Sequence, residues 1–202
     1  MFPQPKLNLL LIRHGQTQAN IEGRFYGRSD SPMTLEGREQ VRTAAAKLKE
    51  VEVAHLYASP AIRAIETAEI LNEQWQTTLT KDERLWEIDH NRWELLTPAE
   101  IMQKYPADWQ KFLAGDTSKP HHGGESHDQV ASRAMKFLNE VQSNHTCEGE
   151  TIALAAHGGL LNIMLCELLG TPNRGWWPYR FKNAGVARVV LYEFGGVLLG
   201  FD

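Results

Sequence analysis

The chain has 202 residues, of which 42% are apolar and 23% charged, and its formal net charge is −4. Such a composition is typical of a globular protein with one substantial core, and the length is too short for two full domains. The acidic balance gives no global basic field for nucleic acid or anionic lipid, and two cysteines are too few for a disulfide scaffold. We therefore expect one domain over residues 1–202 in the cytoplasm, without an export signal and without nucleic-acid or membrane partners, and we leave a homodimer open as the assembly.

An apolar run at residues 9–12 is followed directly by Arg13-His14-Gly15. The run lacks alternation and so predicts a strand that is buried on both faces. In open α/β sheets ligands bind beyond the carboxyl ends of the strands, which places Arg13 and His14 at a binding edge. A cation beside an imidazole suits a phosphate, with His14 as the group that attacks phosphorus. The polar stretch 16–33 is then a long, functional loop.

The next predicted elements alternate between helix and strand. Thr34 can cap a helix whose apolar positions continue to Leu48, and residues 53–58 form a buried-type strand. Ser59-Pro60 has the pattern of a helix N-cap followed by proline at the first helical position, which places Arg63 in the first turn. A short strand is expected at 77–80.

The stretch 85–125 is less regular and is interpreted as a cap insert over the site. Thr97 begins a capping box that predicts a helix towards Tyr105, and a short helical piece is expected at 108–114. After a Pro/His/Gly loop at 119–125, Ser126 begins a second capping box and a helix with apolar positions to Val141.

The last third begins with a predicted strand at 151–156, which ends at His157-Gly158-Gly159. The helix that follows is expected to end at Gly170, and strands at 185–191 and 197–201 are expected to pair through Gly195-Gly196. The alternation predicts an α/β fold, a three-layer α-β-α sandwich with a mostly parallel central sheet and a small helical cap.

Two strands thus end in the same pattern, apolar residues followed by His and Gly. Parallel strands bring His14 and His157 to the same edge of the sheet, and Arg63 with its helix start favours the same negative charge. Two arginines and a charged His157 can stabilise a phosphoryl group, because guanidinium geometry suits phosphate oxygens.

The ordered set of motifs resembles the histidine phosphatase superfamily, which has the phosphoglycerate mutase-like fold. The resemblance rests on residues 11–20 (LIRHGQTQAN), 27–37 (GRSDSPMTLEG), 59–68 (SPAIRAIETA), Glu87, 123–126 (GGES) and 157–159 (HGG). Within the family, small bacterial phosphatases such as α-ribazole-phosphate phosphatase are the most similar. The resemblance implies a metal-independent phosphatase without a cofactor, acting on a small phosphate monoester.

It also implies roles for particular residues. His14 is the nucleophile that becomes phosphorylated, Arg13, Arg63 and His157 hold the phosphoryl oxygens, and Glu87 donates a proton to the leaving oxygen. Asn20, Thr17, Tyr26, Gly27 and Gly158 line the phosphate or substrate. Attack requires a neutral His14, and a poor alkoxide leaving group requires an acid such as Glu87.

Several alternatives stay open. Other functions are phosphoglycerate mutase-type transfer through the same pocket and a non-catalytic protein that binds a phospholigand. Asn20 could satisfy the loop backbone instead, and the tryptophans either fill the core or make a flat wall for a nucleoside-like leaving group. His121, His122 and His127 would make a poor zinc cage. The residues 90–96 lack two glycines that many family members have, so contact of His90, Arg92, Trp93, His121 or His122 with the substrate is undecided, as are the substrate and the pathway.

Overall fold

The computed structural model describes residues 4–116, 119–120, 123–172 and 178–202. In these residues six strands form a single sheet in the order β3-β2-β4-β1-β5-β6. The strands are β1 Leu7–Arg13, β2 His55–Ala58, β3 Thr78–Lys81, β4 Glu150–Ala156, β5 Val186–Tyr192 and β6 Gly195–Phe201. Strands β1 to β4 run parallel to one another, whereas β5 is antiparallel to both β1 and β6. The predicted mostly parallel sheet is therefore confirmed.

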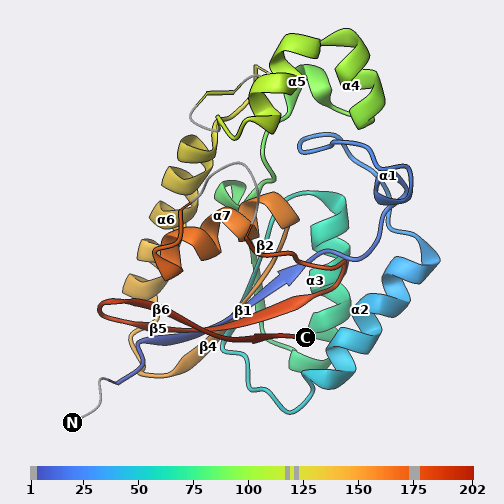
Figure 1. The fold of residues 1–202 in the computed structure, drawn as a ribbon. Helices are drawn as coiled ribbons and strands as arrows, with labels where there is room; N and C mark the ends of the chain where they lie inside the picture. Colours follow the sequence, from blue (N-terminus) through green and yellow to red (C-terminus); the bar gives the residue numbers. More distant parts are fainter. Residues whose placement is uncertain (1–3, 117–118, 121–122, 173–177) are drawn as a thin grey trace.

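Helices cover both faces of the sheet (Figure 1), as the predicted three-layer sandwich requires. One layer contains α2 Leu35–Lys47 and α3 Ile62–Trp75, and the other contains α6 His127–Asn144 and α7 Gly158–Leu169. Alternate side chains of β1 point to the two layers: Leu9 and Leu11 join the core beneath α6 and α7, and Leu10 joins the core beneath α2 and α3. All three are at most 3% exposed, which explains why the run is apolar without alternation.

Two short helices, α4 Pro98–Lys104 and α5 Pro106–Leu113, stand above the sheet as a cap (Figure 1). The Thr97 capping box is present, and so is the Ser126 capping box at the start of α6. The interior of the cap is aromatic: the rings of Phe25, Trp93, Trp109 and Phe112 contact one another edge-on or stacked. Trp93 and Trp109 thus pack inside the cap.

Three local predictions are wrong. The stretch 16–33 contains a helical turn, α1 Gln18–Ile21, because Thr17 and Asn20 form a capping box there. Helix α3 begins at Ile62 after the N-cap Ala61, so Ser59-Pro60 lies before the helix instead of capping it. The turn between β5 and β6 lies at residues 193–194, and Gly195-Gly196 already belongs to β6.

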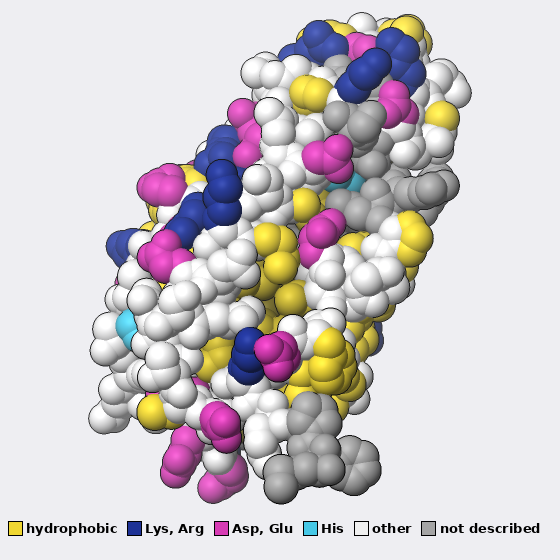
Figure 2. Space-filling view, turned by 90° about the vertical axis from the view of Figure 1, so that its left-hand side faces the viewer, with side chains coloured by type: hydrophobic (Ala, Val, Ile, Leu, Met, Phe, Trp, Pro, Cys, Tyr) yellow, Lys and Arg dark blue, Asp and Glu magenta, His cyan; other side chains and the backbone are white. Residues whose placement is uncertain are grey.

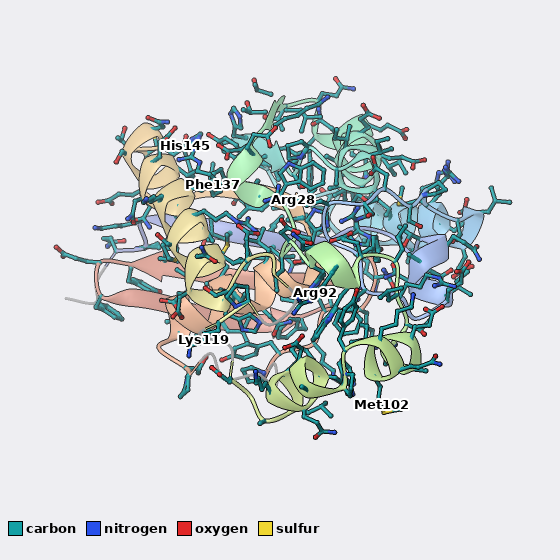
Figure 3. The ribbon with its side chains drawn as sticks, turned by 90° about the horizontal axis from the view of Figure 1, so that it is seen from above. Arg28, Arg92, Met102, Lys119, Phe137 and His145 are labelled. Atoms are coloured by element: carbon teal, nitrogen blue, oxygen red, sulfur yellow. The ribbon has the colours of Figure 1, made fainter. Side chains whose placement is uncertain are left out.

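The two further views show the surface and the cap. On the face that carries α6, charged side chains of both signs are interspersed and hydrophobic ones gather near the middle (Figure 2). Seen from above, Met102 marks α4 on one side of the molecule, Phe137 marks α6 on the other, and His145 marks the C-terminal end of α6 (Figure 3). Within the part of the chain that the structure describes, no helix is long and apolar enough to cross a membrane.

Candidate active site

The sheet topology brings the two strand-His-Gly motifs together. β1 and β4 are parallel neighbours with Arg13 opposite Ala156, so His14 and His157 follow at the same carboxyl edge. Their ring centroids lie 5.4 Å apart with an interplanar angle of 62°. Residues that are distant in sequence therefore form one site, at the edge where ligands bind in such sheets.

His14 is buried and held in one tautomer. Its Nδ1 lies 2.7 Å from the carbonyl oxygen of Gly15. Since a carbonyl can only accept, Nδ1 carries the proton and Nε2 keeps its lone pair. Burial lowers the pKa of His14 well below its ordinary value, and the positive charges of Arg63 and Arg13 lower it further. The imidazole is therefore neutral, as a nitrogen nucleophile must be.

Each of the two arginines presents an unsatisfied donor. Arg63 is fully buried and donates from its terminal nitrogens to the carbonyl oxygens of Ser29 (3.0 Å) and Gly27 (2.8 Å). Arg13 donates from one terminal nitrogen to the carbonyl oxygen of Phe181 at 2.9 Å. The Nε atoms of both arginines are buried without a hydrogen-bond partner among the described residues. Unpaired buried donors are costly, and an anion would satisfy both.

His157 presents a third such donor. Its Nε2 lies 2.7 Å from Oγ of Ser59, and that oxygen also accepts from the amide of Ala61 at 3.3 Å. The Ser59 hydroxyl can therefore donate to Nε2, which leaves the proton of the neutral ring on Nδ1. This Nδ1 is buried and has no partner among the described residues.

The expected charge on His157 is wrong for the substrate-free site. Burial lowers the pKa of His157 well below its ordinary value, and the charge of Arg63 acts in the same direction. A ring enclosed beside a buried guanidinium gains no compensation for carrying its own charge. His157 is thus a neutral hydrogen-bond donor until an anion enters.

Glu87 lies at the start of α7. One carboxylate oxygen accepts from the amide of Gly159 at 2.9 Å, and the other accepts from the amides of Leu160 (2.8 Å) and Ile88 (3.0 Å). Its side chain is buried, and a Cβ on Gly159 would lie only 2.6 Å from the carboxylate. The helix start and the missing side chain at Gly159 together fix the position of this group.

The loop at residues 27–29 is clamped from both sides. Arg63 holds its carbonyl oxygens, and the carboxylate of Glu94 accepts from the amides of Gly27, Arg28 and Ser29 at 2.9–3.2 Å. A Cβ on Gly27 would lie 1.8 Å from the carbonyl oxygen of Ile88, so only glycine fits there. Arg28 lies in the middle of the view from above (Figure 3), 5.1 Å from the Trp86 ring centroid. The Trp86 ring is parallel to His157 at 6.5 Å.

The remaining loop residues form a network of their own. The hydroxyls of Thr17 and Tyr26 are 2.6 Å apart, and the Tyr26 ring lies 4.5 Å from the Arg63 guanidinium. Asn20 uses Oδ1 to accept from the Thr17 amide (3.1 Å) and from Asn183 (2.9 Å). The side-chain oxygen of Asn20 thus satisfies the loop, which is the structural alternative considered for this residue.

Part of this set borders a cavity of about 530 Å³, whereas His14, Arg63 and His157 are not among the residues that line it. Of the residues singled out from the sequence, its walls include Arg13, Asn20, Tyr26, Glu87, His90 and Gly158. Arg92 is directed to the cap instead: it pairs with Asp108 at 2.6 Å and lies over the Tyr105 ring. Trp93 is fully buried in the cap, and His121 and His122 lie outside the described residues. The described residues contain no group of three or more His, Cys, Asp or Glu that could hold a metal ion.

Sequence reasoning missed several residues of the site. The sequence predicts Ser59 as a helix cap, and Glu94, Asn162 and Asn183 belong to none of its motifs. The SPxIR pattern could have indicated Ser59, because a serine directly after a strand lies at the same edge as the two histidines. Nothing local to Glu94, Asn162 or Asn183 indicates their role, since each acts through contacts with distant segments.

The chain belongs to branch 1 of the histidine phosphatase superfamily, whose family model matches residues 9–202. Among individual proteins, it is 30% identical over 193 residues to phosphoserine phosphatase 1 of Hydrogenobacter thermophilus, covering 96% of this chain and 90% of the relative. It is 31% identical to the probable phosphoglycerate mutase GpmB of Proteus mirabilis, covering 91% and 84%. The α-ribazole phosphatase structure from Shigella flexneri shares the fold, with a TM-score of 0.84 at 24% identity over 95% and 94% of the chains.

Proposed function

We propose that the protein is a metal-independent phosphatase that hydrolyses a small phosphate monoester through a phosphohistidine on His14. One observation carries the proposal: three buried donors near a neutral imidazole, Nε of Arg13, Nε of Arg63 and Nδ1 of His157, have no hydrogen-bond partner among the residues that the structure describes. Phosphoryl transfer depends mainly on positioning and on stabilising charge on the phosphoryl oxygens, and these donors supply both. The family and the phosphatases among its members support the same reaction class.

In the first step, Nε2 of His14 attacks phosphorus and forms an N–P bond while the O–P bond to the alcohol breaks. Glu87 gives its carboxyl proton to the departing oxygen, so the alcohol leaves neutral. A bound phosphate dianion adds negative charge beside His157 and thereby favours its protonated form. His157 takes up a proton from solvent when the dianion binds, and it thereby gains the charge that it lacks in the empty site.

In the second step, water attacks the phosphohistidine. Glu87, now a carboxylate, takes one proton from the water as its oxygen bonds to phosphorus, and the N–P bond breaks. Inorganic phosphate leaves, and His14 returns to its neutral form with Nδ1 donating to Gly15. The same carboxyl group therefore serves as acid and then as base.

Rapid quenching during turnover of p-nitrophenyl phosphate tests this mechanism. We expect a burst of acid-labile, base-stable phosphohistidine at His14 and activity that withstands EDTA. His14→Ala should lose both the burst and phosphate release, while Lys136→Gln, on the exposed face of α6, serves as a matched surface control. Turnover that persists in His14→Ala would refute the proposal.

Two other activities remain outcomes of the same experiments. A mutase would isomerise phosphoglycerate faster than it releases phosphate, a possibility that the similarity to a probable phosphoglycerate mutase keeps open. A non-catalytic phospholigand-binding protein would bind vanadate or phosphate yet turn over no monoester. The intact set of His14, Arg63, Glu87 and His157 favours catalysis over binding alone.

We further propose that residues 1–202 act as one domain in the cytoplasm, with a homodimer as the candidate assembly. The two cysteines support a reducing compartment, since Cys147 and Cys166 are both free thiols. Light scattering of the purified protein measures the assembly, and cell fractionation measures the location.

A further inference from the structure

We propose that Asn162 and the segment Arg180–Lys182 select substrates whose leaving alcohol carries both a hydrogen-bond donor and an anionic group, as a phosphorylated hydroxy acid or amino acid does. The inference rests on the proposed phosphatase function. It assigns a specificity role to the side chains of Asn162, Arg180 and Lys182, which the chemistry at phosphorus does not use. All three border the cavity that also contains Arg13 and Glu87.

Asn162 supplies an unsatisfied acceptor. It lies one turn into α7, is 1% exposed, and borders the cavity beside Gly158 and Gly159. Its Nδ2 donates to the carbonyl oxygen of Gly158 at 3.1 Å, and this bond fixes the orientation of the amide. Oδ1 on the opposite side of the amide is buried and has no partner among the described residues. A buried amide oxygen without a donor is costly, so a ligand N–H or O–H would gain by reaching it.

Asn162 would otherwise be an unusual residue in this helix. Its neighbours Leu160, Leu161, Ile163 and Met164 are all fully buried and apolar. An apolar residue would pack there without an unpaired polar atom. The hydrogen bond to Gly158 uses Nδ2 of the Asn162 side chain, and Oδ1 is left for a ligand.

The second wall of the cavity is cationic. Arg180, Phe181 and Lys182 border it, and the side chains of Arg180 and Lys182 are exposed. Neither cation has an ion pair within the described ranges 4–116, 119–120, 123–172 and 178–202. Arg24 also borders the cavity, but Glu22 and Glu100 pair with it at 2.6 and 3.2 Å. Arg180 and Lys182 are therefore the charges available for a second anionic group.

The size of the cavity agrees with this assignment. About 530 Å³ falls in the range of small-molecule sites and exceeds the space that one phosphoryl group needs. The Phe181 carbonyl also accepts from Arg13, so the segment with the two cations is tied directly to the phosphate-binding group. A compact alcohol with an acid group next to a hydroxyl or ammonium offers one group to each wall of this cavity.

A panel of four phosphate esters separates the two features. Propyl phosphate carries neither feature, O-phosphoethanolamine carries only a donor, 3-phosphooxypropanoate carries only an anion, and 3-phosphoglycerate carries both. We expect kcat/KM to be highest for the ester with both features. O-phosphoserine, which also has both, extends the test from a hydroxyl to an ammonium donor, and glycerol bisphosphate tests a phosphate in place of the carboxylate.

The variants are then compared by ratios. Asn162→Leu should lower kcat/KM for 3-phosphoglycerate relative to 3-phosphooxypropanoate about tenfold, because only the first ester has a donor for Oδ1. Asn162→Ser, which retains an acceptor, should restore part of that ratio. Lys182→Gln should lower the ratio of 3-phosphooxypropanoate to propyl phosphate about threefold, as a partly screened charge pair does. Lys136→Gln, with the same charge change on α6, should leave both ratios as in the parent.

The outcomes distinguish the inference from the function on which it rests. If all esters are hydrolysed at equal kcat/KM, or if the ratios do not change in Asn162→Leu and Lys182→Gln, the specificity inference is overturned and the phosphatase remains. If no ester is hydrolysed, including p-nitrophenyl phosphate, the proposed function itself fails. Because Lys182 is exposed, its variant tests the anionic half even if substitution of buried Asn162 unfolds the chain.

Discussion

The substitution Gly159→Ala, at the start of α7, tests whether Glu87 is the proton donor. In the structure, a Cβ on Gly159 lies 2.6 Å from the Glu87 carboxylate and 2.9 Å from Cδ1 of Ile88. Both distances are shorter than van der Waals contact. The carboxylate must therefore shift and weaken its bonds to the amides of Gly159 and Leu160, while the imidazole and the arginines keep their places.

The magnitude follows from what a misplaced acid costs. General acid catalysis contributes about 10²- to 10⁴-fold, so a displaced carboxyl group should lower kcat/KM for an alkyl ester about 10- to 100-fold. A nitrophenolate leaves without needing a proton, so kcat/KM for p-nitrophenyl phosphate, which ends at formation of the phosphohistidine, should fall less than about threefold. The second step, in which Glu87 acts as the base, is common to both esters and lowers kcat for each. Glu87→Gln should show the same contrast between the two esters, with a larger effect on the alkyl ester.

The assay measures phosphate release from propyl phosphate and from p-nitrophenyl phosphate in parallel. Gly200→Ala is the matched control, because a Cβ on Gly200 meets nothing within 4 Å. If kcat/KM falls equally for both esters in Gly159→Ala and in Glu87→Gln, the carboxylate positions the site and does not act as the acid.

Three further predictions concern the rest of the site. Ser59→Ala removes the hydroxyl that bonds to Nε2 of His157, so kcat/KM should fall about tenfold, and Ser59→Thr should recover part of that loss. An unchanged kcat/KM in Ser59→Ala would show that the His157 ring needs no such partner. Glu94→Gln replaces the carboxylate that holds residues 27–29, so it should lower both the melting temperature measured by calorimetry and the affinity for vanadate. If neither quantity falls, Glu94 does not hold this loop in place. Burial lowers the pKa values of His14 and His157 well below the ordinary value for histidine, and it lowers the pKa of His90 to about 4. Below about pH 6.5 the unfolded chain therefore binds more protons than the folded chain does. The free energy of unfolding in urea should thus fall by about 2 kcal/mol per buried histidine from about pH 7.5 to pH 5, whereas a rise would reverse the assigned sign.

The sheet was predictable because its signals are local. The run before His14 is apolar without alternation, and the structure shows why, since both faces of β1 are covered. The capping boxes at Thr97 and Ser126 mark the starts of α4 and α6 correctly for the same reason, because each box closes within four residues. The position of His14 and His157 at one edge of the sheet was also predictable, because each follows the carboxyl end of a parallel strand.

Features that depend on distant contacts were not predictable. The N-cap assignment at Ser59 failed because its hydroxyl bonds to His157, and no local pattern reveals a partner so far along the chain. The charge expected on His157 failed for a similar reason, since burial beside Arg63 belongs to the folded state. The unpaired Oδ1 of Asn162 was not predictable either, because its burial and its lack of a hydrogen-bond partner among the described residues arise only in the folded chain.

The position of β1 in the sheet also bears on how the chain reaches its active form. The first strand to be synthesised lies between β4 and β5, two of the last three. Residues 7–13 therefore have no sheet neighbour to pair with until residues 150–192 have left the ribosome. Pairing across such long sequence separation is slow, so the strand that precedes His14 is among the last parts of the sheet to be enclosed, and the proposed activity should appear only after that step.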